Sequence, residues 1–217
     1  VAVEQGWMDG TYRLSVSGTL REVSFFGANL ELRRTISTAL GENAVDIEDV
    51  VVNRGVRPAP LMLLYHINLG FPLLDEHAVL EGEVNDTRPR TENAAEGLAD
   101  WRTFQPPTAG YVEQCFYHDV PESDDGLARL ALKSPSTGLT FEVAWRKAEL
   151  PFFTEWKMMG EQEYVVGLEP ANAHPDGQAA EGEAGTLRMI EPDETVPFLV
   201  RLSVRKDRET DARQQPG

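Results

Sequence analysis

The chain has 217 residues, of which 41% are hydrophobic, enough apolar side chain for a sizeable core. Asp and Glu outnumber Lys and Arg by 36 to 20, so the formal net charge is −16. This negative charge repels phosphate groups, and we expect neither nucleic acid nor a membrane as a partner. No apolar run approaches the roughly 18 residues of a membrane-spanning helix. The single cysteine, Cys115, indicates a reducing compartment and predicts a cytoplasmic location.

The first quarter of the chain alternates between apolar and polar side chains, which is typical of β-strands with one buried face. Turn residues separate the alternating segments at a spacing of about ten residues, a pattern typical of sandwiches and barrels. The fold class is therefore predicted to be all-β. The expected strands are 11–17, 20–26, 30–36 and 44–52, with Gly18 as the break between the first two.

Residues 61–75 form the most apolar stretch, and two polar side chains stand inside it. In an extended strand His66 and Asn68 lie on one face, with the apolar neighbours on the other. An unpartnered buried polar group costs about 1–3 kcal/mol. The pair therefore either finds hydrogen-bond partners in the core or serves a substrate.

The rest of the chain is predicted to continue the all-β pattern as one domain over 1–204, followed by a charged, disordered tail at 205–217. In chain order we expect a long connection at 76–109 with one short helix near 94–101, a strand at 110–118, a hairpin of 127–134 and 138–145, an edge strand or loop at 149–157, a strand at 164–169, a loop at 173–185, and a closing pair of strands at 186–190 and 196–204.

Familiar catalytic and metal-binding motifs are absent from the sequence. The four histidines have no metal-ligand spacing, and there is no nucleophile elbow or glycine-rich phosphate loop. We therefore expect no metal and no cofactor. An acid–base pair is the stronger candidate, because His66 and Glu169 both stand in or at the end of apolar strands. The alternative for Glu169 is a carboxylate that caps the turn after its strand.

Four segments together resemble a known family. Residues 65–74 read Tyr-His-Ile-Asn-Leu-Gly-Phe-Pro-Leu-Leu, 110–114 read Gly-Tyr-Val-Glu-Gln, 150–157 read Leu-Pro-Phe-Phe-Thr-Glu-Trp-Lys, and 167–170 read Gly-Leu-Glu-Pro. In this order they resemble the DUF4432 branch of the galactose mutarotase-like (aldose 1-epimerase) superfamily.

The resemblance implies a galactose mutarotase-like β-supersandwich that binds a hexose or a derivative of one. It also implies that Glu169 removes the proton of the anomeric hydroxyl while His66 protonates the ring oxygen. Further candidate sugar contacts are Asn68, which shares the face of His66, and Trp156, which could stack on the sugar. The remaining candidates are Glu113, His118 and Lys157.

The chain departs from the family at its start. Mutarotases carry a further histidine and an arginine upstream, and nothing before Thr11 supplies them. Three interpretations stay open: a fragment, a truncated gene product, or a shortened member of the branch. If upstream strands are missing, we expect one open sheet edge that self-association closes. Two alternatives to an isomerase stay open: a carbohydrate-binding protein without turnover, and a structural sandwich in which His66 and Glu169 only satisfy each other.

Overall fold

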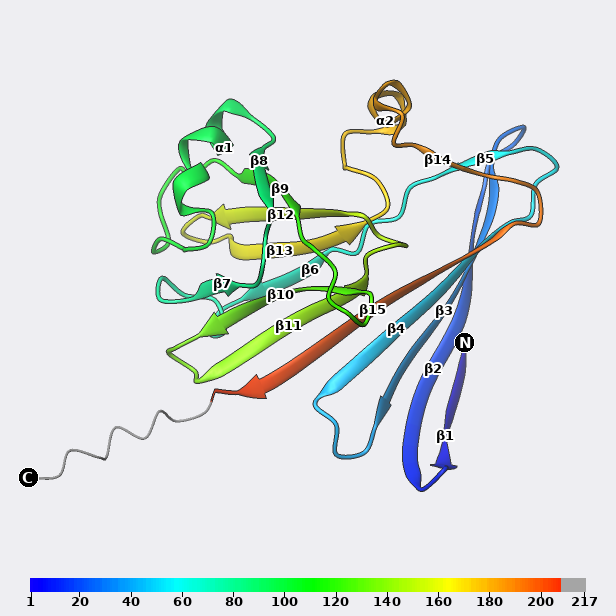
Figure 1. The fold of residues 1–217 in the computed structure, drawn as a ribbon, viewed down its shortest axis with the longest axis horizontal. Coiled ribbons are helices and arrows are strands. Elements are labelled where there is room, and N and C mark those ends of the chain that lie inside the picture. The colour runs from blue at the N-terminus through cyan, green and yellow to red at the C-terminus, as the bar shows by residue number, and fades with distance from the viewer. Residues whose placement is uncertain (208–217) are drawn as a thin grey trace, which may run out of the picture.

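The structure, a computed structural model, describes residues 1–207 and consists of two large antiparallel sheets and a small one (Figure 1). The first sheet has eight strands in the order β1 (Ala2–Met8), β2 (Thr11–Val23), β3 (Asn29–Ala39), β4 (Ala44–Asn53), β15 (Thr195–Lys206), β11 (Leu139–Arg146), β10 (Leu127–Ser134) and β7 (Val79–Glu81).

The second sheet has five strands in the order β6 (Ile67–Gly70), β13 (Tyr164–Ala171), β12 (Phe152–Met159), β9 (Gln114–Asp119) and β8 (Asp86–Pro89). Strands β14 (Arg188–Ile190) and β5 (Ala59–Leu61) pair with each other. The helices are α1 (Glu92–Glu96), the 3-10 turn η1 (Leu98–Asp100) and α2 (Gln178–Ala184). Among residues 1–207, no helix is long and apolar enough to cross a membrane.

The hydrophobic core lies between the two large sheets. Trp145 of β11 stacks on Phe153 of β12 with ring centroids 4.8 Å apart, and neither ring is exposed to solvent. The indole nitrogen of Trp145 donates a hydrogen bond to the carbonyl of Leu150 at 3.0 Å, so its burial leaves no polar group unpaired. Burial of large side chains of this kind is the main stabilising contribution to the sandwich.

The five-stranded sheet covers one part of the longer sheet, while β1, β2 and β3 extend away from it to one side (Figure 1). The apolar face of the longer sheet is therefore covered at one end and open to solvent at the other.

The all-β prediction is confirmed, but several element predictions are wrong. Strand β2 continues through Gly18, which pairs with Arg34 and needs no turn. Residues 2–8 form an additional strand. The stretch 61–75 is not one strand, because it divides into the end of β5, an isolated bridge at Leu64 and β6. The connection 76–109 contains β7, β8, α1 and η1, and α2 lies within the expected loop 173–185.

The prediction of an edge strand or loop at 149–157 is wrong, because the segment contributes to β12, an interior strand. Pro151 precedes the first paired residue, Phe152, so the missing N–H of proline costs no ladder hydrogen bond. The predicted closing pair is also wrong, since β14 pairs with β5 and β15 pairs with β4 and β11. Of the predicted tail 205–217, residues 205 and 206 belong to β15, and 208–217 lie outside the described residues.

Candidate active site

His66 and Glu169 meet on the outward face of the five-stranded sheet. Glu169 lies on β13, and His66 directly precedes β6, the strand that pairs with β13. His66 Nε2 is 2.9 Å from Glu169 Oε1. The histidine side chain is 44% exposed, whereas that of the glutamate is only 5% exposed. The alternation predicted around His66 is confirmed, because Tyr65 and Leu69 are buried while His66 and Asn68 are exposed.

A glycine creates the space in which this pair meets. Gly167 lies opposite Asn68 in the pairing of β13 with β6. A Cβ atom at Gly167 would lie 2.6 Å from Glu169 Oε1 and 2.9 Å from His66 Cε1. Both distances are too short for non-bonded atoms, so any larger residue here would displace the pair. Glycine inside a strand often marks such a close approach.

Trp156 forms the next part of the same face. It lies on β12, opposite Gly167, and its ring meets the His66 ring edge-on with centroids 5.5 Å apart. The indole nitrogen donates a hydrogen bond to Glu113 Oε2 at 2.7 Å. The structure therefore brings together five of the predicted site residues: His66, Asn68, Glu113, Trp156 and Glu169.

The environment of Glu169 favours its protonated form. Burial raises the pKa of this carboxyl group to about 7, and the positive charge of Arg90 opposes the rise. Although His66 Nε2 is close, it is not directed for a hydrogen bond, and Oε1 receives none from residues 1–207. A buried acceptor of this kind is available to a hydroxyl group of a ligand.

A polar cluster borders the pair on the side of β9, and no pattern in the sequence indicates it. Arg90 Nε donates to Asp176 Oδ1 at 2.9 Å, and the Tyr117 hydroxyl group lies 2.8 Å from both oxygens of Asp176. The ring of His174 packs on Tyr117 and on Phe152, each at a centroid distance of 4.3 Å. Arg90 and Asp176 are 86 positions apart in the sequence, and only folding brings them together.

The predicted sugar contacts of His118 and Lys157 are corrected by the structure, because both side chains point into the core. His118 Nε2 lies 3.0 Å from Glu155 Oε2, its Nδ1 lies 2.9 Å from Thr87 Oγ1, and neither His118 nor Glu155 is exposed. Lys157 Nζ donates to the backbone carbonyls of residues 100, 101 and 103, and burial lowers its pKa. Side chains alternate along a strand, so these residues face away from Tyr117 and Trp156.

The described residues 1–207 contain no group of three or more His, Cys, Asp or Glu side chains placed to hold a metal ion. At its centre the outward face offers the Glu169 carboxyl group beside the His66 imidazole, and the Trp156 ring packs on that imidazole. Such a set can move protons on a small polar molecule and pack against its apolar surface.

A family model described as a domain of unknown function, DUF4432, matches residues 1–204. The chain belongs to the DUF4432 family. The family predicted from the four sequence segments is thereby confirmed. No curated protein sequence matches this DUF4432 chain.

Solved structures share the fold of this DUF4432 protein. A candidate aldose 1-epimerase from Klebsiella pneumoniae matches with a TM-score of 0.89 and 24% identity over 94% of this chain and 54% of that chain. A galactose mutarotase-like protein from Clostridium acetobutylicum matches with a TM-score of 0.64 and 12% identity, over 94% of this chain and 66% of that chain. A galactose 1-epimerase from Lactobacillus acidophilus matches with a TM-score of 0.59 and 12% identity, again over 94% of this chain and 66% of that chain.

The predicted galactose mutarotase-like sandwich is thus confirmed. The chain spans about half the length of the Klebsiella protein, 54% of it. At these sequence identities the similarity establishes the fold.

Proposed function

We propose that this protein interconverts the anomers of an aldose, with Glu169 as the general base and His66 as the general acid. The observation that carries the proposal is the 2.9 Å approach of His66 Nε2 to Glu169 Oε1 on an open face of the sheet. The names of the structural neighbours, which include candidate and named aldose epimerases, support the same chemistry.

The proposed reaction begins with opening of the sugar ring. Glu169 takes the proton of the anomeric hydroxyl group, the bond between the anomeric carbon and the ring oxygen breaks, and His66 gives a proton to that ring oxygen. The resulting aldehyde rotates about its bond to the next carbon. Ring closure reverses both proton transfers and yields the other anomer. No electron is gained or lost, and the two residues return to their starting states, so the reaction needs no cofactor.

The spacing of the pair suits this reaction, because the anomeric and ring oxygens are bonded to the same carbon. A base and an acid that serve two such close oxygens must themselves lie close together, each within about 2.6–3.2 Å of its own oxygen. Glu169 is fixed by burial, whereas the half-exposed His66 side chain has room to turn toward an arriving sugar.

The raised pKa of Glu169 supports its role as the base. A carboxyl group with a pKa of about 7 is a stronger base than an ordinary glutamate and is still substantially ionised at neutral pH. Each proton transfer of this type typically contributes about 10²–10⁴-fold to a rate.

The proposed substrate is an uncharged hexose or a derivative of one. Trp156 offers a ring for the apolar side of the sugar, and Asn68 and Glu113 offer hydrogen-bonding groups on the same face. Glu113, Glu169 and Asp176 give this face an excess of carboxylates, which disfavours a phosphorylated sugar. We also propose a cytoplasmic location, supported by the single free cysteine, Cys115.

The test follows the approach of pure α-anomers to equilibrium by proton NMR, for a panel of aldoses, with and without the protein. We expect acceleration by the wild type and a loss of about 10²–10⁴-fold in Glu169→Gln, which keeps the shape of the side chain but cannot accept the proton. Sugar binding without acceleration would favour the second candidate, a carbohydrate-binding protein that uses Trp156. Absence of both would contradict the proposal.

A further inference from the structure

Two buried polar side chains lie side by side on the outward face of the five-stranded sheet. Thr154 of β12 pairs directly with Glu169 of β13, so the two side chains share a face and their Cβ atoms lie about 4.5–5.5 Å apart. Thr154 is 1% exposed and Glu169 is 4% exposed. Neither Thr154 Oγ1 nor Glu169 Oε1 has a hydrogen-bond partner within residues 1–207. A buried hydroxyl donor thus stands next to a buried acceptor, and each lowers stability until it is paired.

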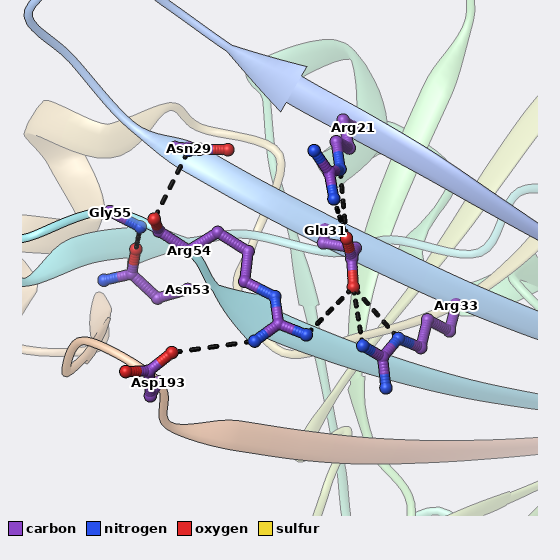
Figure 2. Close-up of polar contacts among 8 residues, drawn as sticks. All are labelled: Arg21, Asn29, Glu31, Arg33, Asn53, Arg54, Gly55 and Asp193. Carbon is purple, nitrogen blue, oxygen red and sulfur yellow. Dashed lines mark hydrogen bonds and ion pairs between the residues drawn. The ribbon is translucent and has the colours of Figure 1, made fainter.

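A second buried carboxylate shows how the same fold satisfies such a group elsewhere. The Glu31 side chain is 5% exposed, like that of Glu169, but Figure 2 shows it held by Arg21, Arg33 and Arg54. The nitrogen–oxygen distances are 2.7, 2.8 and 3.2 Å, and these arginines lower the pKa of Glu31 to about 2. Glu169 Oε1 receives no such bond from residues 1–207, and burial raises the pKa of Glu169 to about 7. A donor that favours the ionised form therefore has an open place at Glu169.

The other donors that flank Thr154 on this face are already engaged. The Tyr117 hydroxyl group, opposite Thr154 on β9, lies 2.8 Å from both oxygens of Asp176. The indole nitrogen of Trp156, two residues along β12, donates to Glu113 Oε2 at 2.7 Å. Among these three neighbours, the hydroxyl group of Thr154 is therefore the donor that stays free within residues 1–207.

We propose that Thr154 is a positioning residue for Glu169, to whose ionised carboxylate its hydroxyl group donates a hydrogen bond, directly or through one water molecule. A threonine hydroxyl group moves between staggered positions by rotation about the Cα–Cβ bond, and the longer glutamate side chain spans the remaining distance between the strands. The bond fixes the direction of the carboxylate and favours its ionised form, which accepts the anomeric proton. This inference rests on the proposed function, because it gives Thr154 the task of keeping Glu169 ready as the base.

Several titratable and charged groups surround Glu169 and also act on its ionisation. His66 approaches from the segment before β6, and Arg90, which follows β8, contributes a positive charge. The remaining groups on this face are Glu113, Cys115 and Tyr117 from the β9 segment and His174 and Asp176 from the segment after β13. Substitutions at Thr154 leave all of these groups in place, so a change in the titration of Glu169 reports the hydroxyl group itself.

The test is a titration of the Glu169 carboxyl group by carbon-13 NMR, with its signal assigned by its absence in Glu169→Gln. Thr154→Val removes the hydroxyl group and nearly keeps the shape of the side chain, so we expect the titration midpoint to rise by about one pH unit. Thr154→Ser keeps the hydroxyl group and should restore the wild-type midpoint. The acidic limb of the pH–rate profile for anomer interconversion should move with the midpoint in Thr154→Val.

Thr87→Val is the matched control, because it removes a hydroxyl group from the inner face of the same sheet. Thr87 Oγ1 lies 2.9 Å from His118 Nδ1, so this variant should lose stability in thermal unfolding and keep the Glu169 midpoint.

Equal midpoints in Thr154→Val and the wild type would overturn the inference. Equal shifts in Thr154→Val and Thr154→Ser would also overturn it, since they would reflect packing rather than the hydroxyl group. Because the titration needs no turnover, a raised midpoint in Thr154→Val would support the hydrogen bond even if the wild type accelerated no sugar, a result that would contradict the proposed function alone.

Discussion

The five-stranded sheet carries two histidine–glutamate pairs, one on each face, and they have nearly the same geometry. The nitrogen–oxygen distance is 2.9 Å between His66 and Glu169 and 3.0 Å between His118 and Glu155. Their surroundings differ. The His66 side chain is 44% exposed, whereas both members of the inner pair are fully buried.

Access to solvent, rather than the pair itself, therefore separates a candidate catalytic site from a structural contact. In the inner pair the second ring nitrogen of His118 is already engaged with Thr87, so the imidazole has no position left for a ligand. Glu155 Oε1 and Glu169 Oε1 both lack a hydrogen bond within residues 1–207, but only Glu169 lies beside a half-exposed histidine that a ligand can reach. The same two residue types therefore serve stability on one face and, in our proposal, chemistry on the other.

The largest expected effect is that of His66→Gln on the rate of anomer interconversion. Glutamine can form hydrogen bonds but cannot give a proton to the ring oxygen, so we expect a fall of about 10²–10⁴-fold. The measurement is the rate, followed by proton NMR, at which the pure α-anomer approaches equilibrium with equal amounts of variant and wild type. An unchanged rate would remove His66 from the proposed mechanism and weaken the distinction between the two pairs.

Gly167→Ala should reduce the same rate without removing either reacting group. The new Cβ atom would overlap Glu169 Oε1 and His66 Cε1, at 2.6 and 2.9 Å, and shift the pair. Misplacement by about 1 Å can cost on the order of 10²-fold in rate. Gly70→Ala is the matched control, because a Cβ atom there meets only the carbonyl oxygen of Tyr164 at an ordinary 3.5 Å. Equal rates in the two variants would contradict a positioning role for Gly167.

His118→Ala is expected to affect stability and spare the chemistry. It leaves Glu155 and Thr87 without their partner in the core, and an unsatisfied buried polar group costs about 1–3 kcal/mol. Urea unfolding measures the loss, and the rate per folded molecule should match that of the wild type. A variant of normal stability and low activity would reverse the roles that we assign to the two pairs.

The smallest expected effect is a pH dependence that Glu169 imparts. The ionised fraction of Glu169 should rise about tenfold between pH 6 and pH 8, given a pKa of about 7, and this rise sets the acidic limb of the pH–rate profile. Removal of the opposing positive charge in Arg90→Met should move this rise to higher pH.

Stability should follow the opposite trend. Folding raises the pKa of Glu169 from 4.5 to about 7, so between these values the folded chain binds more protons than the unfolded chain. The free energy of unfolding contributed by this group is then fully present below about pH 4.5 and falls as the pH rises through 7. Glu169→Gln should lack this contribution, which urea unfolding at several pH values would reveal. Identical pH profiles in the two proteins would contradict the raised pKa.

Part of this site could be predicted from sequence alone. Alternation correctly separated His66 and Asn68 from Tyr65 and Ile67, because the side-chain period of a strand is two. The same rule could not say which face of β9 and β12 is buried. Those strands place His118, Glu155 and Lys157 in the core, so polarity did not mark the exposed side.

Other features depend on contacts between distant segments. Position 167 needs glycine because the His66 side chain lies directly against it. His66 belongs to a different segment, so the sequence around Gly167 alone does not reveal this contact. The Arg90–Asp176 pair joins residues 86 positions apart. Strand β1 escaped prediction because neither of its faces is buried in the described chain, so it lacks the pattern that identifies half-buried strands.

The most direct test of the account compares Glu169→Gln with Glu155→Gln in one mutarotation assay. The substitutions are chemically identical and differ only in the face of the sheet that they alter. We expect Glu169→Gln to lose about 10²–10⁴-fold in rate and Glu155→Gln to retain the wild-type rate per folded molecule. Equal rates in the two variants, whether both high or both low, would contradict the assignment of the outward pair as the catalytic one.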